Sequence, residues 1–375
     1  GRPAVVTVVS RWWVLRRRKR TPGNRLSRAR YLKNGRVAMV NTSAHVRSLS
    51  DSAKPLAYVI WRKNHVGLTA LIGSILRGLQ VSEWLNAKPF VDLESFHTAY
   101  SEDEPVNGSR NVWEYFFEPV SEVTREAIEA GRFRVIAADG AHPHIEGSHD
   151  ETDYRQLWAR WVRPNPTLAA HWDSCAEEVG PSNATIAVHF RAGDMRGFRN
   201  HPMPATIDQT LAATRFLLDK GSYDRVFLAT QEEQHEAVFR REFGKRLLSL
   251  ENFRPSNRSE KNMTPFLTPS VLQRKDSSPR PQHFYRLGLE VLADAWVMAQ
   301  CGALVAGSSN VALLARVMRE HPHQDQIWIW NGFNGRSVTF NKLRWLWKSA
   351  APKKAGGFRT WSQDWVHQPG SPGPR

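Results

Sequence analysis

The sequence of 375 residues is 41% hydrophobic and 23% charged, which excludes an intrinsically disordered chain and, at this length, favours two domains. Its formal net charge of +16 indicates an anionic partner: a phosphorylated ligand, a nucleic acid, an acidic glycan or a membrane surface. No run approaches the roughly 18 consecutive apolar residues that a transmembrane helix needs, so we expect no membrane-spanning segment in this sequence.

The beginning of the chain carries a large share of the positive charge. Segment 11–36 is Arg-rich, contains no acidic residue and shows no clear period. We therefore predict a basic arm or stem over residues 1–50, with contact to a polyanion as the alternative. Cys175 and Cys301 fall in different predicted helices, which favours two separate buried thiols over a disulfide.

The next part of the chain has the pattern of an α/β unit. Apolar runs predict strands at 56–61, 88–93 and 133–137, and apolar spacing predicts helices at 68–84, 153–163 and 167–179. Segment 101–111 is polar and rich in turn residues, so we expect a loop there.

The pattern becomes regular in the second half, where strands and helices alternate strictly. We predict strands at 185–190, 225–230, 303–307 and 326–330, helices at 205–219, 232–243, 286–300 and 310–319, and a long loop at 251–282. Such alternation is typical of a doubly wound parallel sheet. The expected domains are an N-terminal α/β domain at 51–180, a Rossmann-like domain at 181–340, and a basic, aromatic and Pro/Gly tail at 341–375.

Polar residues stand where three strands of this second unit end. They are His189, Arg191, Gly193 and Asp194 at the first strand, Thr230 at the second, and Ser308, Ser309 and Asn310 after the third. Ligands of open parallel sheets bind beyond the carboxyl ends of the strands. The Arg191 fork of donors suits a phosphate, and Gly193 allows close approach of the backbone. The small polar residues before the last helix expose N–H groups to an anion, with an ordinary N-cap as the alternative.

These motifs in this order resemble the fucosyltransferase superfamily: HFRAGD after an apolar strand, then VFLAT, then ADAWVMAQCGALVAGSSNVALLARVM. That group includes α1,6-fucosyltransferases, rhizobial nodulation fucosyltransferases and protein O-fucosyltransferases. The resemblance covers residues 185–320 closely and the first half more loosely, through loop 62–67, strand 88–92 and stretch 111–121. It implies a GT-B fold, in which two Rossmann-like domains face a cleft and the C-terminal one binds GDP-fucose.

The resemblance also implies roles for single residues. Arg191 would hold the β-phosphate of the donor, His189 would lie near the nucleoside, Asp294 would read guanine, and Ser309 with Asn310 would lie at the diphosphate. Two departures affect the exact donor contacts. Ala192 stands where many relatives carry a second basic residue, and Thr-Gln-Glu (230–232) stands where Thr-Asp-Asp is common.

The chemistry expected from these residues needs no metal and no cofactor beyond the donor. Arg191 and the helix N-terminus at Ser309 would stabilise the departing diphosphate, and the sequence has no Asp-x-Asp pair of the kind that clamps Mn²⁺ and nucleotide. The family inverts the anomeric configuration by direct displacement. Candidates for an acceptor-side base are Asn64, His65, Asp92 and Glu94, the alternative being that they shape the cleft or stay solvated.

The expected partners are GDP-fucose and a glycan or glycoprotein acceptor. No nucleic-acid motif occurs, and we expect membrane attachment only through an upstream anchor outside this chain. Five Asn-x-Ser/Thr sequons lead us to expect the secretory pathway, in the Golgi lumen, with a bacterial-type cytoplasmic protein as the alternative. The alternative function is a non-catalytic basic binder of nucleic acid or acidic glycan.

Overall fold

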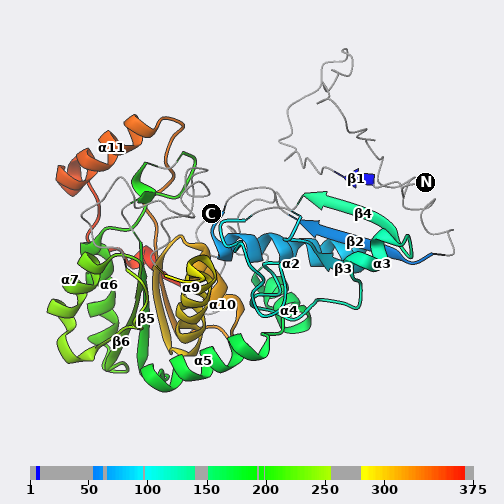
Figure 1. Cartoon of the computed structure of the whole chain (residues 1–375). Helices are drawn as coiled ribbons and strands as arrows, with labels where there is room; N and C mark the ends of the chain where they lie inside the picture. Colours follow the sequence, from blue (N-terminus) through cyan, green and yellow to red (C-terminus); the bar gives the residue numbers. More distant parts are fainter. Residues whose placement is uncertain are drawn as a thin grey trace, which may run out of the picture.

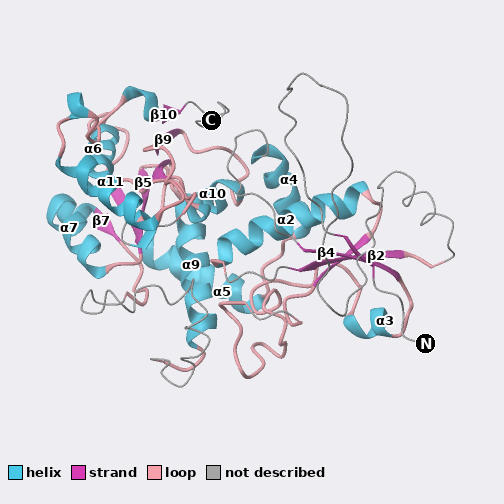
Figure 2. Cartoon of the chain, turned by 90° about the horizontal axis from the view of Figure 1, so that it is seen from above, coloured by secondary structure: helices cyan, strands magenta, loops and turns pink. Residues whose placement is uncertain are grey.

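Two mostly parallel sheets organise the chain (Figure 1, Figure 2). The computed structural model describes residues 6–8, 54–61, 66–95, 98–139, 151–191, 194–197, 199–254 and 280–367. The first sheet has the order β1-β4-β2-β3, all parallel. Its strands are β1 (Val6–Val8), β2 (Leu56–Trp61), β3 (Lys88–Val91) and β4 (Arg134–Asp139).

The second sheet has the order β10-β9-β8-β5-β6-β7, and only β10 runs antiparallel to its neighbour. Its strands are β5 (Thr185–Phe190), β6 (Arg225–Thr230), β7 (Leu247–Leu248), β8 (Ala303–Gly307), β9 (Asp325–Ile329) and β10 (Val366–His367). All six residues of β5 are buried, as expected for a central parallel strand covered on both faces.

Helices cover both faces of this second sheet. Alternate residues of β5 show it: Ala187 packs in the cluster that contains α9 and α10, while Ile186 and Val188 pack in the cluster that contains α6 and α7. The α-helices of both units, in chain order over the described residues, are α2 (Leu68–Trp84), α3 (Arg125–Glu129), α4 (Glu151–Trp161), α5 (Pro166–Val179), α6 (Ile207–Leu218), α7 (Glu233–Phe243), α9 (His283–Gln300), α10 (Asn310–Val317) and α11 (Val338–Ala350).

Capping residues set several of these helix ends. Asn165 caps α5 with its side chain, Pro166 follows as the first helical residue, and Gly180 closes the helix in the left-handed region at φ 58°. Thr206 and Gln209 form a capping box at the start of α6. The loop before α6 is therefore fixed where it enters the helix.

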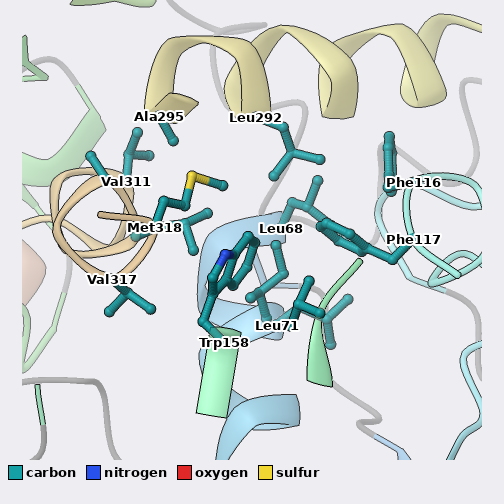
Figure 3. Close-up of a cluster of buried hydrophobic side chains, with 14 of the residues drawn as sticks. Leu68, Leu71, Phe116, Phe117, Trp158, Leu292, Ala295, Val311, Val317 and Met318 are labelled. Carbon is teal, nitrogen blue, oxygen red and sulfur yellow. The ribbon is translucent and has the colours of Figure 1, made fainter. Parts of the chain in front are cut away.

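One hydrophobic cluster joins the two halves of the chain. Leu68 and Leu71 of α2, Phe117 and Trp158 lie in the same buried cluster as Leu292, Ala295, Val311 and Met318 of α9, α10 and the residue after α10. Figure 3 shows these side chains pointing toward one another from different helices and, for Phe117, from the segment before α3. Dispersion and the hydrophobic effect across this junction hold the two sheets in one arrangement.

The predicted α/β class and the parallel sheets are confirmed. The strands at 56–61, 185–190, 225–230 and 303–307 and the helix at 68–84 have their predicted bounds. Cys175 and Cys301 are free and buried, as predicted. A cleft between two domains and the domain boundaries stay predictions.

The structure differs from the sequence prediction at both ends. The predicted basic arm contributes β1, which pairs with β4, and the predicted tail contains most of α11 and contributes β10, which pairs with β9. Strands of two or three residues have no readable period, because sheet pairing alone stabilises them. No helix among the described residues is long and apolar enough to cross a membrane.

Candidate active site

The predicted site residues of the second unit meet at one edge of the second sheet. In the register, His189 of β5 lies opposite Ala229 of β6 and Ala306 of β8, so the residues that follow these strands share the same edge. From β5 the chain adds β6 and β7 on one side and then β8 and β9 on the other. The junction of β5 and β8 is thus a topological switch point, where helices diverge and leave room for a ligand.

His189 presents a buried, neutral imidazole at this edge. Burial and, to a lesser extent, the positive charge of Arg191 together lower the pKa of His189 to about 3. The next residue, Phe190, packs edge-on against His235 and beside Phe239 of α7. These contacts anchor the end of β5, so the residue that follows emerges from a rigid strand.

Arg191 lies where the two halves of the chain meet. Its charge acts on Tyr100 of the first half, whose hydroxyl accepts a hydrogen bond from the backbone N–H of Leu68 at the start of α2, at 3.1 Å. Burial raises the pKa of Tyr100, while the Leu68 hydrogen bond and the Arg191 charge oppose that rise. Arg191 and the N-terminus of α2 are therefore neighbours of the same tyrosine.

The N-terminus of α10 lies on the other side of the switch point. Ser309 is its N-cap, with extended backbone, and its hydroxyl accepts the N–H of Val311 at 3.2 Å. Ser308 and Asn310 are half-buried beside it. The predicted small polar residues thus stand at the positive end of a helix, within one strand spacing of the end of β5. This geometry fits both an anion site and the ordinary cap.

A second group of buried polar side chains lies beyond the end of β6. The carboxylate of Asp294 in α9 accepts a hydrogen bond from Asn252 Nδ2 at 2.9 Å. Burial raises the pKa of Asp294 to about 7, against the opposing effects of Arg254 and of the Asn252 hydrogen bond. The guanidinium of Arg254 donates to the Thr230 carbonyl at 3.2 Å and pairs with Glu236 of α7 at 3.0 Å.

Thr230 completes this group with a hydroxyl that is buried and has no hydrogen-bond partner among the described residues. A buried hydroxyl without a partner is costly, so Thr230 Oγ1 is suited to a ligand. Asn252 and Arg254 were missed by sequence reasoning, because they fall in a segment read as loop. Nothing in their local sequence distinguishes them from solvated residues.

The structure does not bring the four candidates for the acceptor-side base together at this edge. Asp92 accepts the backbone N–H groups of Glu94 and Ser95 through Oδ1 and pairs with Arg125 at 2.7 Å, while Glu94 lies 3.4 Å from Arg125. These contacts make Asp92 the anchor of the turn after β3. Asn64 and His65 lie outside the described residues.

The structure gives little information on the last two predicted residues of this edge, Gly193 and Asp194. Gly193 lies outside the described residues, and Asp194 begins the short 3₁₀-helix η1 (Asp194–Arg196). Among the described residues, no group of three His, Cys, Asp or Glu side chains is placed to hold a metal ion.

No protein-family model and no curated protein matches the sequence. The fold is similar to solved fucosyltransferase structures. NodZ α-1,6-fucosyltransferase soaked with GDP-fucose shares 14% identity and a TM-score of 0.47, over 75% of this chain and 98% of NodZ. A mutant of Arabidopsis thaliana FUT1 in complex with GDP shares 10% and 0.40, over 78% and 74%. POFUT1 without ligand shares 9% and 0.44, over 75% and 100%.

Proposed function

We propose that the chain is an inverting, metal-independent glycosyltransferase that moves fucose from GDP-fucose to a hydroxyl group of a glycan or protein. The observation that carries the proposal is the position of Arg191 and the α10 N-terminus on the two sides of the switch point of a doubly wound sheet. A nucleoside diphosphate is the ligand that this combination of a guanidinium and free helical N–H groups suits.

The proposed reaction is a single displacement. The acceptor oxygen attacks C1 of fucose, the bond from C1 to the phosphate oxygen breaks, and the configuration at C1 inverts. Negative charge grows on the departing diphosphate, where Arg191 and the N-terminus of α10 stabilise it. The acceptor proton goes to a base that remains among Asn64, His65, Asp92 and Glu94 or to solvent.

We assign recognition of the guanine base to the polar side chains beyond the end of β6, namely Asp294, Asn252 and Thr230. An ionised carboxylate only accepts hydrogen bonds, so Asp294 would accept from the N–H groups on one edge of guanine. Asn252 orients that carboxylate through its 2.9 Å hydrogen bond. Thr230 Oγ1, for which the described residues provide no partner, would form a hydrogen bond with the bound donor.

The proposal includes the domain arrangement and the cellular location of the enzyme. Residues 51–180 would form the acceptor-side domain and residues 181–340 the donor domain, facing each other across a GT-B cleft. The protein would act in the Golgi lumen of the secretory pathway or, as a bacterial-type protein, in the cytoplasm.

Calorimetry with GDP, with and without EDTA, followed by product analysis with GDP-fucose and an acceptor array, tests the proposal. We expect sub-millimolar GDP binding that EDTA leaves unchanged, and transfer to at least one acceptor. Loss of binding in EDTA would contradict the metal-free mechanism. Stabilisation by oligonucleotides or acidic glycans but not by GDP would favour the basic binder instead.

A further inference from the structure

Helix α11 (Val338–Ala350) presents an apolar face to solvent. It lies at the outer end of the second unit, far from the first sheet (Figure 1, orange). Its four most exposed large apolar side chains are Phe340, Leu343, Leu346 and Trp347, each 55–61% exposed. At roughly 100° per residue these four fall within an arc of about 120° on one side of the helix. A patch of this kind on a soluble protein marks an interaction site.

The opposite face of α11 is tied to the protein, so the apolar face cannot turn inward. Asn341 is fully buried and exchanges hydrogen bonds with the N–H and carbonyl groups of Gly335, at 2.7 and 3.0 Å. Trp345 lies 3.8 Å from the Arg196 guanidinium and against Phe358. The helix is thus held as a rigid element with its apolar side outward.

The charged residues of the chain segment that contains α11 have one sign. No acidic residue occurs between Asp325 and Asp364, whereas this stretch contains seven basic residues: Arg336, Lys342, Arg344, Lys348, Lys353, Lys354 and Arg359. On the helix, Lys342 follows one flank of the apolar arc, and Arg344 and Lys348 follow the other. The apolar face is therefore bordered by cations on both sides.

We propose that α11 docks this face onto an anionic lipid surface. A helix with bulky apolar side chains on one face and lysines and arginines beside them inserts the apolar face at the boundary of head groups and acyl chains. Each cation near the surface adds attraction to anionic lipids. A second copy of the chain is a poorer occupant, because a two-fold interface would bring the same cations face to face.

This surface contact would differ from an upstream anchor, since it comes from the folded second unit itself. Trp345 contacts Arg196, and Asn334 Nδ2 donates to the Met195 carbonyl at 3.1 Å, so α11 and the loop before it support the segment that follows β5. Docking through α11 would hold that segment close to the membrane. The inference depends only on α11 and not on the proposed reaction.

Vesicle flotation tests the proposal with the full chain. We expect the protein to float with vesicles of phosphatidylcholine containing roughly 30% phosphatidylserine, to stay behind with phosphatidylcholine alone, and to be released by high salt. The variants Leu343→Ser/Trp347→Ser and Lys342→Glu/Lys354→Glu should each lower the partition coefficient about tenfold or more. All four side chains are exposed, so the thermal unfolding of both variants should match wild type.

Matched controls change the same residue types elsewhere. Trp84→Ser, at a side chain that is 64% exposed on α2, and Lys245→Glu, at an exposed lysine, should leave flotation unchanged. Because Cys175 and Cys301 are buried, a fluorophore on Leu346→Cys reports insertion by a blue shift with anionic vesicles. Wild type that does not float, or α11 variants that float as well as wild type, would overturn the proposal. A dimer that the α11 variants dissociate, without lipid binding, would overturn it in favour of self-association.

Discussion

The carboxyl ends of the two sheets are built from the same kinds of residue but use them differently. At the first sheet, Asp92 follows β3 and is surrounded by its own partners: two backbone N–H groups and the Arg125 guanidinium. At the second sheet, the Thr230 hydroxyl at the end of β6 has no hydrogen-bond partner within the described part of the chain, and the Asp294 carboxyl is buried with a raised pKa. Asp92 at the first edge is thus satisfied by neighbouring groups, whereas at the second edge burial disfavours the ionised form of Asp294 and leaves Thr230 Oγ1 without a partner among the described residues.

The difference shows how to separate a structural polar residue from a functional one. A group whose hydrogen bonds are complete lowers the free energy of the fold, and removing it should cost stability. A group kept in an unfavourable state by burial contributes little to stability, and removing it should cost binding or catalysis. Paired substitutions at the two edges test this rule.

The largest contrast is expected between Arg191→Ala and Arg125→Ala. Arg191→Ala should lower turnover of GDP-fucose about 10²–10³-fold, roughly 3–4 kcal/mol, because the leaving diphosphate loses its cation. Arg191→Lys should restore only part of the rate, since an ammonium lacks the fork. Arg125→Ala should instead lower the free energy of unfolding by about 1–2 kcal/mol and leave turnover nearly unchanged.

Steady-state kinetics and urea unfolding of each variant measure the two effects. Arg241→Ala, at an exposed position of α7, controls for loss of a positive charge and should change neither. Normal turnover by a folded Arg191→Ala protein would end the assignment of this site. A shifted pH profile in Arg125→Ala would instead point to Asp92 as the base.

The same contrast explains how far the sequence could predict the molecule. The second edge was predicted because buried parallel strands are unbroken apolar runs, so polar residues such as Arg191 and Thr230 stand out where the runs end. Asn252 and Arg254 reach Asp294 and Thr230 only through tertiary folding, as does Arg125, which meets Asp92 from 33 positions away. Contacts between distant segments leave no local period to read.

A smaller contrast involves pH. The folded-state pKa of Asp294 is raised from 3.8 to about 7, so its stabilising contribution is complete below pH 3.8 and is lost as pH rises through about 7. Asp294→Asn should therefore gain stability relative to wild type between these pH values and no further above pH 7. The control Asp325→Asn should show no such change above pH 4, because Lys220 and Tyr223 lower the folded-state pKa of Asp325 in spite of burial, so that its contribution to stability is lost only as pH falls below 3.8.

Thermal unfolding of wild type and variants from pH 4 to pH 8 measures how the stability difference between Asp294→Asn and wild type changes with pH. In the same variant, preference for GDP over ADP and UDP should fall about tenfold or more, since one acceptor oxygen becomes an NH2 donor that opposes the guanine N–H groups and the negative charge is lost. The GDP affinity of the wild type should rise with pH up to about 7, as Asp294 ionises. The increase in affinity that comes from this ionisation should be absent in Asp294→Asn. Full retention of the GDP preference would refute the assigned role of Asp294.

A smaller effect again is expected from single hydroxyl groups. Thr230→Val removes a buried hydroxyl without a described partner, so stability should stay level or rise, while GDP affinity falls by roughly 1–1.5 kcal/mol. Thr214→Val is the matched control. It removes a buried hydroxyl that donates to the Thr210 carbonyl at 2.8 Å, and it should lower stability by about 1 kcal/mol with GDP affinity intact. Calorimetry and urea unfolding distinguish the two patterns, and a Thr230→Val protein that binds GDP normally contradicts the first.

The smallest contrast compares two helix caps. Ser309 caps α10 at the second edge, and Thr124 caps α3 in the first unit, where its side chain accepts the Ala127 N–H at 3.2 Å. Replacing either by Ala should lower stability by about 0.5–1 kcal/mol, because each cap satisfies one helical N–H group. Only Ser309→Ala should also weaken GDP binding, by a few-fold, since loss of its cap loosens the N–H groups proposed to face the diphosphate. Equal GDP affinities in the two variants, measured at matched fractions of folded protein, would make Ser309 an ordinary cap and leave Arg191 as the sole anion contact of the switch point.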